Sequence, residues 1–313
     1  MQRRFTAASL VLVAGLSLSL IGCGKMGELR AKKSFKEANQ FYTQQDYKRA
    51  ADKYKETIDN DPNLTTAYFY LANSYDQQFK ATKRGDPTND NFLTLAISNY
   101  KLAAEKDLDP KIKKLALQYL VNAYGPDKLS DPGQAVPILE KMIQMDSQDT
   151  ANYFALAKMY EDAGQYDEAE KYLNQAREMK PKDPAVYGQL AGFFNRQGEF
   201  EKTIDAYKQW QAIEPNNPEV YYTIGSFYWD KVYHDTKLKP NEKRDFINAG
   251  MQEIDKAIQL KPDYFEAVNR KGLLVRLQAG LTTDKAEYDR LMKQADELLQ
   301  KSMALQKKKA GGM

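Results

Sequence analysis

The sequence contains only one histidine and one cysteine among its 313 residues. A single cysteine cannot form a disulfide within the chain. One histidine and one cysteine also fall short of the usual zinc ligand sets. A phosphate-binding glycine loop, an HExxH motif and a GxSxG motif are all missing. We therefore expect no enzyme activity, no cofactor and no metal site.

The chain has little net charge. It contains 46 Lys and Arg residues against 43 Asp and Glu, which gives a formal net charge of +3. Dedicated nucleic-acid-binding proteins normally show a strong basic excess. The composition thus argues against nucleic acid as a partner, and no motif points to a small-molecule substrate. What the sequence does contain is tyrosine, with 21 residues.

The first residues are typical of an export signal. Arg3 and Arg4 precede a run of 15 apolar or small residues from Ala7 to Ile21. A membrane-spanning helix needs about 20 such residues, so this run predicts a signal peptide. It ends in Leu20-Ile21-Gly22-Cys23, which resembles the lipobox of bacterial lipoproteins.

The lipobox resemblance implies a processed and lipidated chain. Residues 1–22 are expected to be removed, and Cys23 to carry acyl chains such as palmitate that anchor the protein in a membrane. Residues 23–30 are expected to form a short tether. Gly24 stands where an aspartate would retain an enterobacterial lipoprotein in the inner membrane. The resemblance therefore favours the outer membrane, facing the periplasm, or the cell membrane if the source has only one.

The rest of the chain repeats with a period of 34 residues. Thr150–Asp183 aligns with Pro184–Asn217, and the matching positions share residue type. The matched pairs are Tyr153 with Tyr187, Leu156 with Leu190, Ala157 with Ala191, Tyr160 with Phe194, Gly164 with Gly198, Tyr166 with Phe200, and Pro181 with Pro215. This pattern resembles the tetratricopeptide repeat (TPR), in which each unit is a pair of antiparallel helices.

The resemblance implies an all-α, right-handed α-solenoid of about seven TPR hairpins. Small residues are expected where helices cross closely, with large aromatic residues beside them. Prolines, including Pro110, are expected to close the units. Glu37 and Lys271 replace an expected apolar residue in the first and last units, which suits a wetter end face. The predicted units are 31–64, 65–110, 114–149, 150–183, 184–217, 218–264 and 265–309, followed by a flexible tail at 310–313.

Three long insertions depart from the repeat. They are expected to lengthen the turns within hairpins at 76–95, 229–249 and 276–294. The first insertion, QQFKATKRGDPTNDN, predicts irregular structure. The third has helical spacing and is expected to lengthen the second helix of its hairpin.

The family resemblance also places a binding groove along the first helix of each unit. Asn39, Asn73 and Asn122 fall at one equivalent position, where they could either hydrogen-bond a partner's backbone or cap local groups. Trp229 borders an insertion, which favours contact with a partner, whereas most aromatic residues at helical spacing belong to a core. The complete set of expected groove residues is Phe35, Asn39, Tyr42, Phe69, Asn73, Asn122, Phe154, Lys158, Asn195, Arg196, Tyr222 and Trp229.

These expectations favour a membrane-anchored, non-catalytic scaffold of the bacterial cell envelope that binds a protein or peptide in its concave groove. The alternative is a structural subunit of an envelope machine, such as one for pilus and secretin assembly or outer-membrane protein insertion. Such a subunit would use its outer edge and insertions. An envelope hydrolase is the least favoured alternative, because the many carboxylates form no recognisable constellation.

Overall fold

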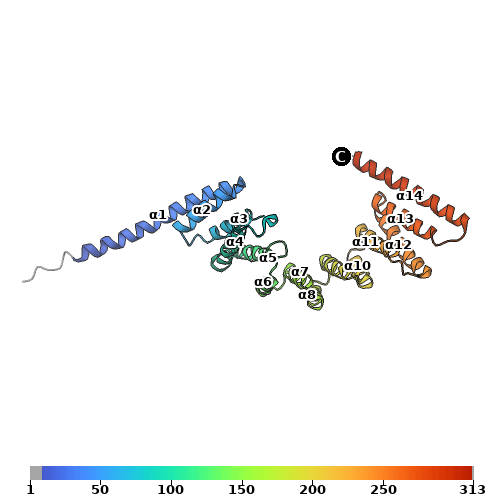
Figure 1. The fold of residues 1–313 in the computed structure, drawn as a ribbon, viewed down its shortest axis with the longest axis horizontal. Coiled ribbons are helices and arrows are strands. Elements are labelled where there is room, and N and C mark those ends of the chain that lie inside the picture. The colour runs from blue at the N-terminus through green and yellow to red at the C-terminus, as the bar shows by residue number, and fades with distance from the viewer. Residues whose placement is uncertain (1–8, 312–313) are drawn as a thin grey trace, which may run out of the picture. The chain divides into compact units, whose positions relative to one another are not determined.

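The computed structural model describes the backbone of residues 9–311 and the side chains of residues 25–311. Helices account for nearly all of the regular structure, and no strand occurs in this described range. Within it, fourteen α-helices follow one another along the chain (Figure 1), which confirms the predicted all-α fold of seven hairpins. The helices are α1 Ser9–Thr43, α2 Tyr47–Asn60, α3 Thr66–Asp76, α4 Pro87–Lys106, α5 Pro110–Ala123, α6 Pro132–Met145, α7 Thr150–Asp162, α8 Tyr166–Met179, α9 Pro184–Arg196, α10 Phe200–Ile213, α11 Pro218–His234, α12 Pro240–Leu260, α13 Phe265–Ala279 and α14 Lys285–Gly311.

The helices form two compact bodies. The N-terminal body ends at Ala169 and the C-terminal body begins at Glu170, so the division falls inside α8. Within each body, consecutive helices pack as pairs, and each pair packs on the next one. Because each helix pair can bury its apolar face only against a neighbour, stacking supplies the core of both bodies.

Small residues lie where the helices cross closely, as the repeat pattern predicts. Ala38 and Ala72, on the first helices of the first two hairpins, are fully buried. A Cβ atom added to Gly225 of α11 would lie 2.6 Å from the Ile254 side chain and 3.0 Å from the Gly250 carbonyl oxygen of α12. These distances are too short for any side chain larger than hydrogen. The repeat's small positions are therefore contacts between backbones, which explains their spacing.

Prolines and aspartates set the helix starts, and one expected role is wrong. Pro110 was expected to close the second repeat, but it occupies the first turn of α5. The preceding Asp109 caps that helix by accepting a hydrogen bond from the Lys111 amide at 2.8 Å. Proline is tolerated at this position because the amide it lacks would have no partner there. Asp-Pro therefore begins a helix here rather than ending one.

The insertions contain more regular structure than the sequence suggests. The first insertion was expected to be irregular, yet α4 begins at Pro87 within it and a 3₁₀ turn occupies Ala81–Lys83. Buried Asn89 holds this turn, because its side chain bonds the backbone of Lys80 and Lys83 at 2.9 to 3.1 Å. The third insertion lengthens α14 to 27 residues, which confirms the expected longer second helix.

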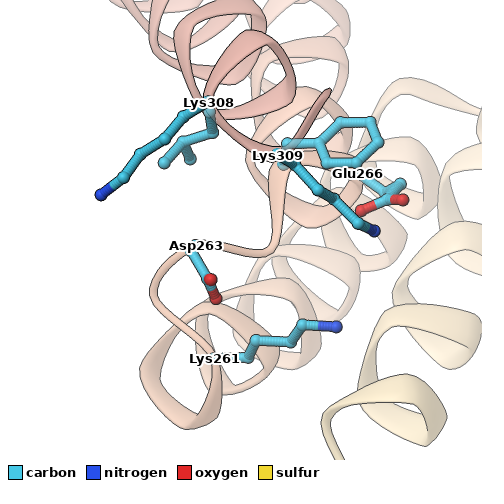
Figure 2. Close-up of a pocket in the computed structure, with 7 residues that line it drawn as sticks. Lys261, Asp263, Glu266, Lys308 and Lys309 are labelled. Atoms are coloured by element: carbon cyan, nitrogen blue, oxygen red, sulfur yellow. The ribbon is translucent and has the colours of Figure 1, made fainter. Parts of the chain in front are cut away.

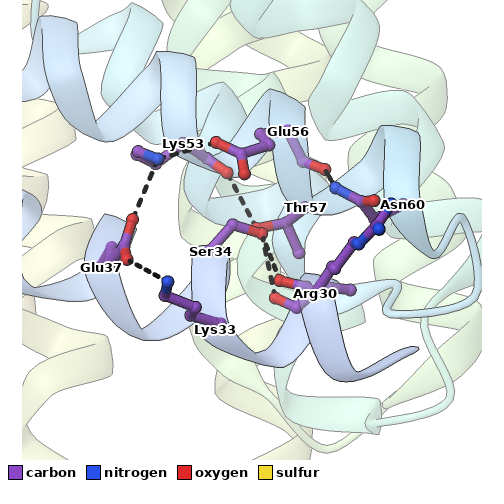
Figure 3. Close-up of polar contacts among 9 residues, drawn as sticks. Arg30, Lys33, Ser34, Glu37, Lys53, Glu56, Thr57 and Asn60 are labelled. Carbon is purple, nitrogen blue, oxygen red and sulfur yellow. Dashed lines mark hydrogen bonds and ion pairs between the residues drawn. The ribbon is translucent and has the colours of Figure 1, made fainter. Parts of the chain in front are cut away.

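Ion pairs replace apolar contacts in the two end hairpins. Glu37 of α1 pairs with Lys53 of α2 at 2.9 Å, and Lys53 also pairs with Glu56 at 2.8 Å (Figure 3). Lys271 of α13, in the last hairpin, pairs at 2.5 Å with Asp255 of α12, in the sixth hairpin. The charged side chains remain partly exposed, but the Lys271 pair lies between two hairpins and not on an end face.

The helix α1 continues through the segment expected to be a tether. Its backbone is helical from Ser9 to Thr43, residues 23–30 included. A Cβ atom on Gly27 would lie 2.8 Å from the Asn60 carbonyl oxygen, so α1 already touches the end of α2 at this residue. The side chain of Cys23 and those of the expected signal peptide lie outside the described set. Among the described residues, no helix is both long enough and apolar enough to cross a bilayer.

Candidate functional site

The expected groove positions of the first two hairpins are occupied by an internal hydrogen-bond network. Asn39 of α1 accepts a hydrogen bond from the Tyr54 hydroxyl at 2.6 Å. Tyr42, one turn later, donates to the Asn73 side-chain oxygen at 2.6 Å. Both bonds join neighbouring helices, because Tyr54 belongs to α2 and Asn73 to α3. Two of the three expected asparagine ligands therefore already have partners within the chain.

The network continues from Asn73 into the third hairpin. The Asn73 amide donates to the Tyr100 hydroxyl at 3.2 Å, and that hydroxyl donates to Asp76 at 3.4 Å. Lys128 reaches the other oxygen of Asp76 at 2.5 Å. Asn73 is 1 % exposed, so its amide groups are not available to a partner in this conformation. We call Tyr42, Asn73, Tyr100, Asp76 and Lys128 the polar chain.

Aromatic rings surround the polar chain. Tyr54 and Tyr70 stack with ring centroids 5.7 Å apart, and Phe35 meets Tyr54 edge-on at 5.7 Å. Phe69, a further expected groove residue, is buried and packs against Tyr119 at 5.6 Å. Offset and edge-on ring pairs of this kind add about 0.5–1.5 kcal/mol beyond the area they bury. Phe35, Tyr42 and Phe69 therefore belong mainly to the packing between hairpins.

Burial keeps these tyrosines neutral. It raises the pKa of Tyr42 to about 12, with a smaller contribution from neighbouring tyrosines. Burial also raises the pKa of Tyr54 and that of Tyr100, where the nearby Asp76 carboxylate adds to the effect. A neutral phenol can donate its proton to an amide or carboxylate oxygen, which the hydrogen bonds of the polar chain require.

Several expected groove residues remain accessible. Asn122 on α5 and Lys158 on α7 are exposed, and Phe154 on α7 is half-buried. Lys158 forms an ion pair with Asp162 one turn later on the same helix. In the C-terminal body, Asn195 and Arg196 are exposed at the end of α9. The chain brings none of these residues together with the polar chain in a single cluster.

Tyr222 lies against the turn that joins α12 and α13. Its ring centroid is 5.1 Å from that of Tyr264. The Tyr264 hydroxyl donates to Glu219, and the Lys261 ammonium lies 4.3 Å from the Tyr264 ring centroid. Burial, together with the Glu219 carboxylate, raises the pKa of Tyr264. Tyr222 is half-buried, so one part of its ring faces solvent beside this charged corner.

Trp229 is part of an accessible cluster of rings. It stacks on Tyr233, one turn later on α11, with centroids 4.9 Å apart and planes 14° from parallel. The Arg270 guanidinium of α13 lies 4.3 Å from the Trp229 ring centroid, and His234 meets Tyr233 edge-on at 4.9 Å. Tyr233 is 59 % exposed. We call Trp229, Tyr233, His234 and Arg270 the aromatic platform.

The sequence reasoning identified only one member of this platform. Tyr233 and Arg270 were not expected to contribute, because the repeat pattern ends its first helix before residue 233. In the structure α11 continues to His234. The spacing of Trp229 and Tyr233, four residues apart, could have predicted that they share a helix face. A cation over an aromatic face is attracted by the electron-rich ring, so Arg270 also fixes the orientation of Trp229.

The surface pockets are open to solvent and are lined by both acidic and basic residues. A pocket of 370 Å³ at the end of the C-terminal body is lined by residues of the α12–α13 turn and of α14. Figure 2 shows Lys308 and Lys309 extending to opposite sides of α14, so their ammonium groups do not converge on one ligand. A second cleft, of 510 Å³, lies among α8, α9 and α10 and mixes acidic, basic and aromatic residues. No group of three or more His, Cys, Asp or Glu side chains within the described residues could hold a metal ion.

Comparison with known proteins supports the repeat architecture. Residues 128–192 match the tetratricopeptide repeat family. The search of curated proteins gives no match. A solved structure of the C-terminal part of a TPR repeat-containing protein from Cytophaga hutchinsonii is similar to the chain, with 14% identity and a TM-score of 0.58. The similarity covers 87% of this chain and 98% of that one.

Two further solved structures are more distant. A tetratricopeptide repeat protein from Parabacteroides merdae has 14% identity, a TM-score of 0.48, and coverage of 85% of this chain and 99% of that chain. The protein MamA has 20% identity, a TM-score of 0.42, and coverage of 66% and 99%. The match at residues 128–192, the paired helices and their small crossing residues agree with one another, so the chain contains tetratricopeptide repeats within an all-α helical-hairpin fold.

Proposed function

We propose that this protein is a non-catalytic scaffold that binds a protein or peptide partner through the aromatic platform and the helix faces beside it. The stack of half-buried Trp229 on exposed Tyr233 is the observation that carries this proposal. Tryptophan, tyrosine and arginine are enriched at the energetic centres of protein interfaces, because they combine large apolar area with polar contacts. The platform presents all three residue types at one place.

The proposal narrows the groove expected from the sequence. In the first two hairpins the residues at the equivalent positions form hydrogen bonds within the chain. They therefore stabilise the packing of the hairpins and do not contact a partner in this conformation. On α11 of the sixth hairpin, Tyr222 and Trp229 are only partly buried. Tyr222 lies two turns before Trp229 on this helix and would extend the binding surface along it. An extended peptide or a single helix would fit a surface of this length.

We further propose that Cys23 carries a lipid anchor in the bacterial cell envelope, at the outer membrane facing the periplasm or at the cell membrane of a source with one membrane. The lipobox-like Leu20-Ile21-Gly22-Cys23 supports this part of the proposal. Incorporation of radiolabelled palmitate into the wild-type chain, and its loss in Cys23→Ser, would support the anchor. Wild-type chain that takes up no label would contradict it.

Crosslinking in the native envelope followed by mass spectrometry tests the partner. Crosslinks from α11 and α13 to one partner protein, lost in Trp229→Ala, would support the scaffold. They should be kept in Phe92→Ala, which removes a half-buried ring on α4 of the N-terminal body, beside Tyr75. Crosslinks that persist in Trp229→Ala and come from the insertions would instead support the alternative, a structural subunit of an envelope machine. The third reading, an envelope hydrolase, would require turnover of cell-wall material by the purified chain.

A further inference from the structure

One face of α1 packs closely against α2. Gly27, Ala31 and Ser34 recur every three or four residues along α1, and Ala31 and Ser34 are buried. Gly27 abuts the Asn60 carbonyl, and the Ser34 hydroxyl bonds that of Thr57 at 3.0 Å (Figure 3). The rotation of α1 about its axis is therefore fixed from Gly27 onward.

The opposite face of the same segment is exposed and amphipathic. At about 100° of rotation per residue, Leu29 and Lys36 lie on the side directly opposite the buried residues. Leu29 is 68 % exposed and Met26 is 56 % exposed. The Lys33 side chain, beside them, is 81 % exposed. We call Lys25, Met26, Leu29, Lys32, Lys33 and Lys36 the α1 basic face; all six residues are exposed.

Charge is concentrated on this segment. Residues 25–36 contain five basic side chains and one acidic side chain, Glu28, which gives a net charge of 5 − 1 = +4. The formal net charge of the entire chain is only +3. The other residues therefore sum to −1, and this positively charged segment also carries two exposed apolar side chains.

We propose that the α1 basic face docks on the surface of an anionic lipid bilayer. Lysines beside exposed apolar side chains are the signature of interfacial helices, whose apolar groups enter the headgroup boundary while the ammonium groups bind lipid phosphates. Each lysine near such a surface strengthens binding about fivefold. Met26 and Leu29 are the apolar groups, and the four lysines flank them.

The position of the face in the chain supports a lipid occupant over a protein one. Lys25 follows Cys23 by two residues, which is about 3 Å along a helix. If Cys23 is acylated, as the proposed function holds, the basic face is kept at the headgroup level without any further movement. The docking itself depends on the exposed side chains and can be tested apart from the acyl group.

Amine footprinting of the full chain tests the proposal. The chain is reconstituted on vesicles of zwitterionic lipid, and on vesicles in which part of the lipid is anionic. An amine-acylating reagent is then applied and the modified lysines are measured by mass spectrometry. We expect Lys25, Lys32, Lys33 and Lys36 to react about tenfold more slowly on anionic vesicles. Exposed Lys48 and Lys55, both on α2, serve as internal controls and should react equally on both.

Salt and matched variants sharpen the test. The protection should disappear at about 0.5 M salt, where charges are screened within a few ångströms. It should also fall in Leu29→Glu, and in Lys32→Glu with Lys33→Glu, but not in Lys55→Glu. These side chains are exposed, and circular dichroism checks that each variant keeps its helices.

The outcomes separate this inference from the proposed anchor. If the chain floats with both kinds of vesicle and the four lysines react equally on both, the basic face does not dock, while the anchor proposal stands. If the chain binds neither kind of vesicle, both proposals fail. Protection that appears on anionic vesicles alone, and is lost in the charge-reversal variants, supports the docking.

Discussion

Equivalent repeat positions serve different purposes at the two ends of the chain. Tyr42 and Trp229 both follow a small crossing residue by four positions, Ala38 in one case and Gly225 in the other. The Tyr42 hydroxyl is tied to Asn73 across the hairpin junction. Trp229 instead stacks on the exposed Tyr233 and under Arg270. The repeat fixes where a side chain points, but its neighbours decide whether it is structural or available.

The position just after the small residue shows the same division. Asn73 is buried and makes two side-chain hydrogen bonds, to Tyr42 and Tyr100. Ser226 stands at the same place in the sixth hairpin, and its buried hydroxyl oxygen has no hydrogen-bond partner among the described residues. A buried polar atom contributes to stability only when its partners are present. The second hairpin therefore uses this position for packing between helices, and the sixth hairpin does not.

The largest expected effect is on the stability of the N-terminal body. Asn73→Ala removes the acceptor of Tyr42 and the donor to Tyr100, and it leaves a small cavity. We expect it to lower the free energy of unfolding by about 2–3 kcal/mol. Ser226→Ala, the matched change, should alter it by less than about 0.5 kcal/mol. Urea denaturation followed by circular dichroism measures both, and equal losses would show that the two bodies do not differ in this way.

The next effect is on binding. Trp229→Ala should weaken capture of the partner at least tenfold, because a stacked tryptophan with a cation over its ring is typical of a binding hot spot. Because Trp229 also packs against the buried core formed by α12 and α13, circular dichroism must show that the variant keeps its helices. Tyr42→Phe should instead reduce stability by about 1 kcal/mol and leave binding unchanged. The affinity of each variant for the crosslinked partner is then measured. If both variants lose binding, the distinction between a binding role for Trp229 and a structural role for Tyr42 is wrong.

A third prediction concerns pH. The pKa of Tyr42 is raised to about 12 in the fold, from an ordinary value of 10.0. A group with a raised folded-state pKa contributes stability that is complete below the unfolded value and is lost as pH rises toward the folded value. The pKa of Lys53 is also raised to about 12, by its hydrogen bonds to Glu56 and Glu37, and acts in the same direction.

We therefore expect the N-terminal hairpins to lose helix as pH rises from about 10 to about 12. Far-ultraviolet circular dichroism gives the helix content, and absorbance of the phenolate reports tyrosine ionisation over the same range. The part of the wild-type phenolate signal that is missing in Tyr42→Phe should rise together with the loss of helix. In Tyr42→Phe the loss of helix with pH should be shallower. Ionisation of Tyr42 at its ordinary pKa with the helices intact would contradict the account.

The smallest effect is expected at the ion pairs of the first and last hairpins. Glu37→Gln removes the ion pair with Lys53 but leaves Lys53 paired with Glu56. Exposed pairs of this kind contribute about 0–1 kcal/mol, and the remaining partner reduces the loss further. We expect a change of less than about 0.5 kcal/mol in urea denaturation, comparable to that for Lys271→Gln at the other end. A loss above about 2 kcal/mol at one end alone would mean that the end hairpins are not equivalent.

The repeat pattern predicted the helix pairs because its small residues lie where two helix backbones pack closely. At position 225 there is room only for glycine, so a glycine there indicates a close helix crossing without further information. Pro110 was misread for the opposite reason. A proline can follow the end of one helix or lie in the first turn of the next. Here the hydrogen bond that Asp109 accepts from the Lys111 amide shows that Pro110 begins α5.

The candidate site was less predictable than the fold. The partners of Asn39 and Asn73 come from other helices, and the bond between Tyr42 and Asn73 crosses from the first repeat unit to the second. The aromatic platform also depends on α11 continuing for an extra turn, which carries Tyr233 under Trp229. Arg270 reaches the platform from the next hairpin. Contacts between units therefore determine the site, whereas the pattern within a unit determines the fold.

The contact between Gly27 and Asn60 has a mechanical consequence. The helix α1 is unbroken to Thr43 and packs against α2 from Gly27 onward. It therefore cannot rotate about its axis independently of α2. A pull or twist applied at the start of α1 reaches α2 as torque instead of being absorbed by slack chain. A few glycine and serine residues inserted before Gly27 would supply that slack, and they would uncouple the hairpin's rotation from whatever holds the chain's beginning.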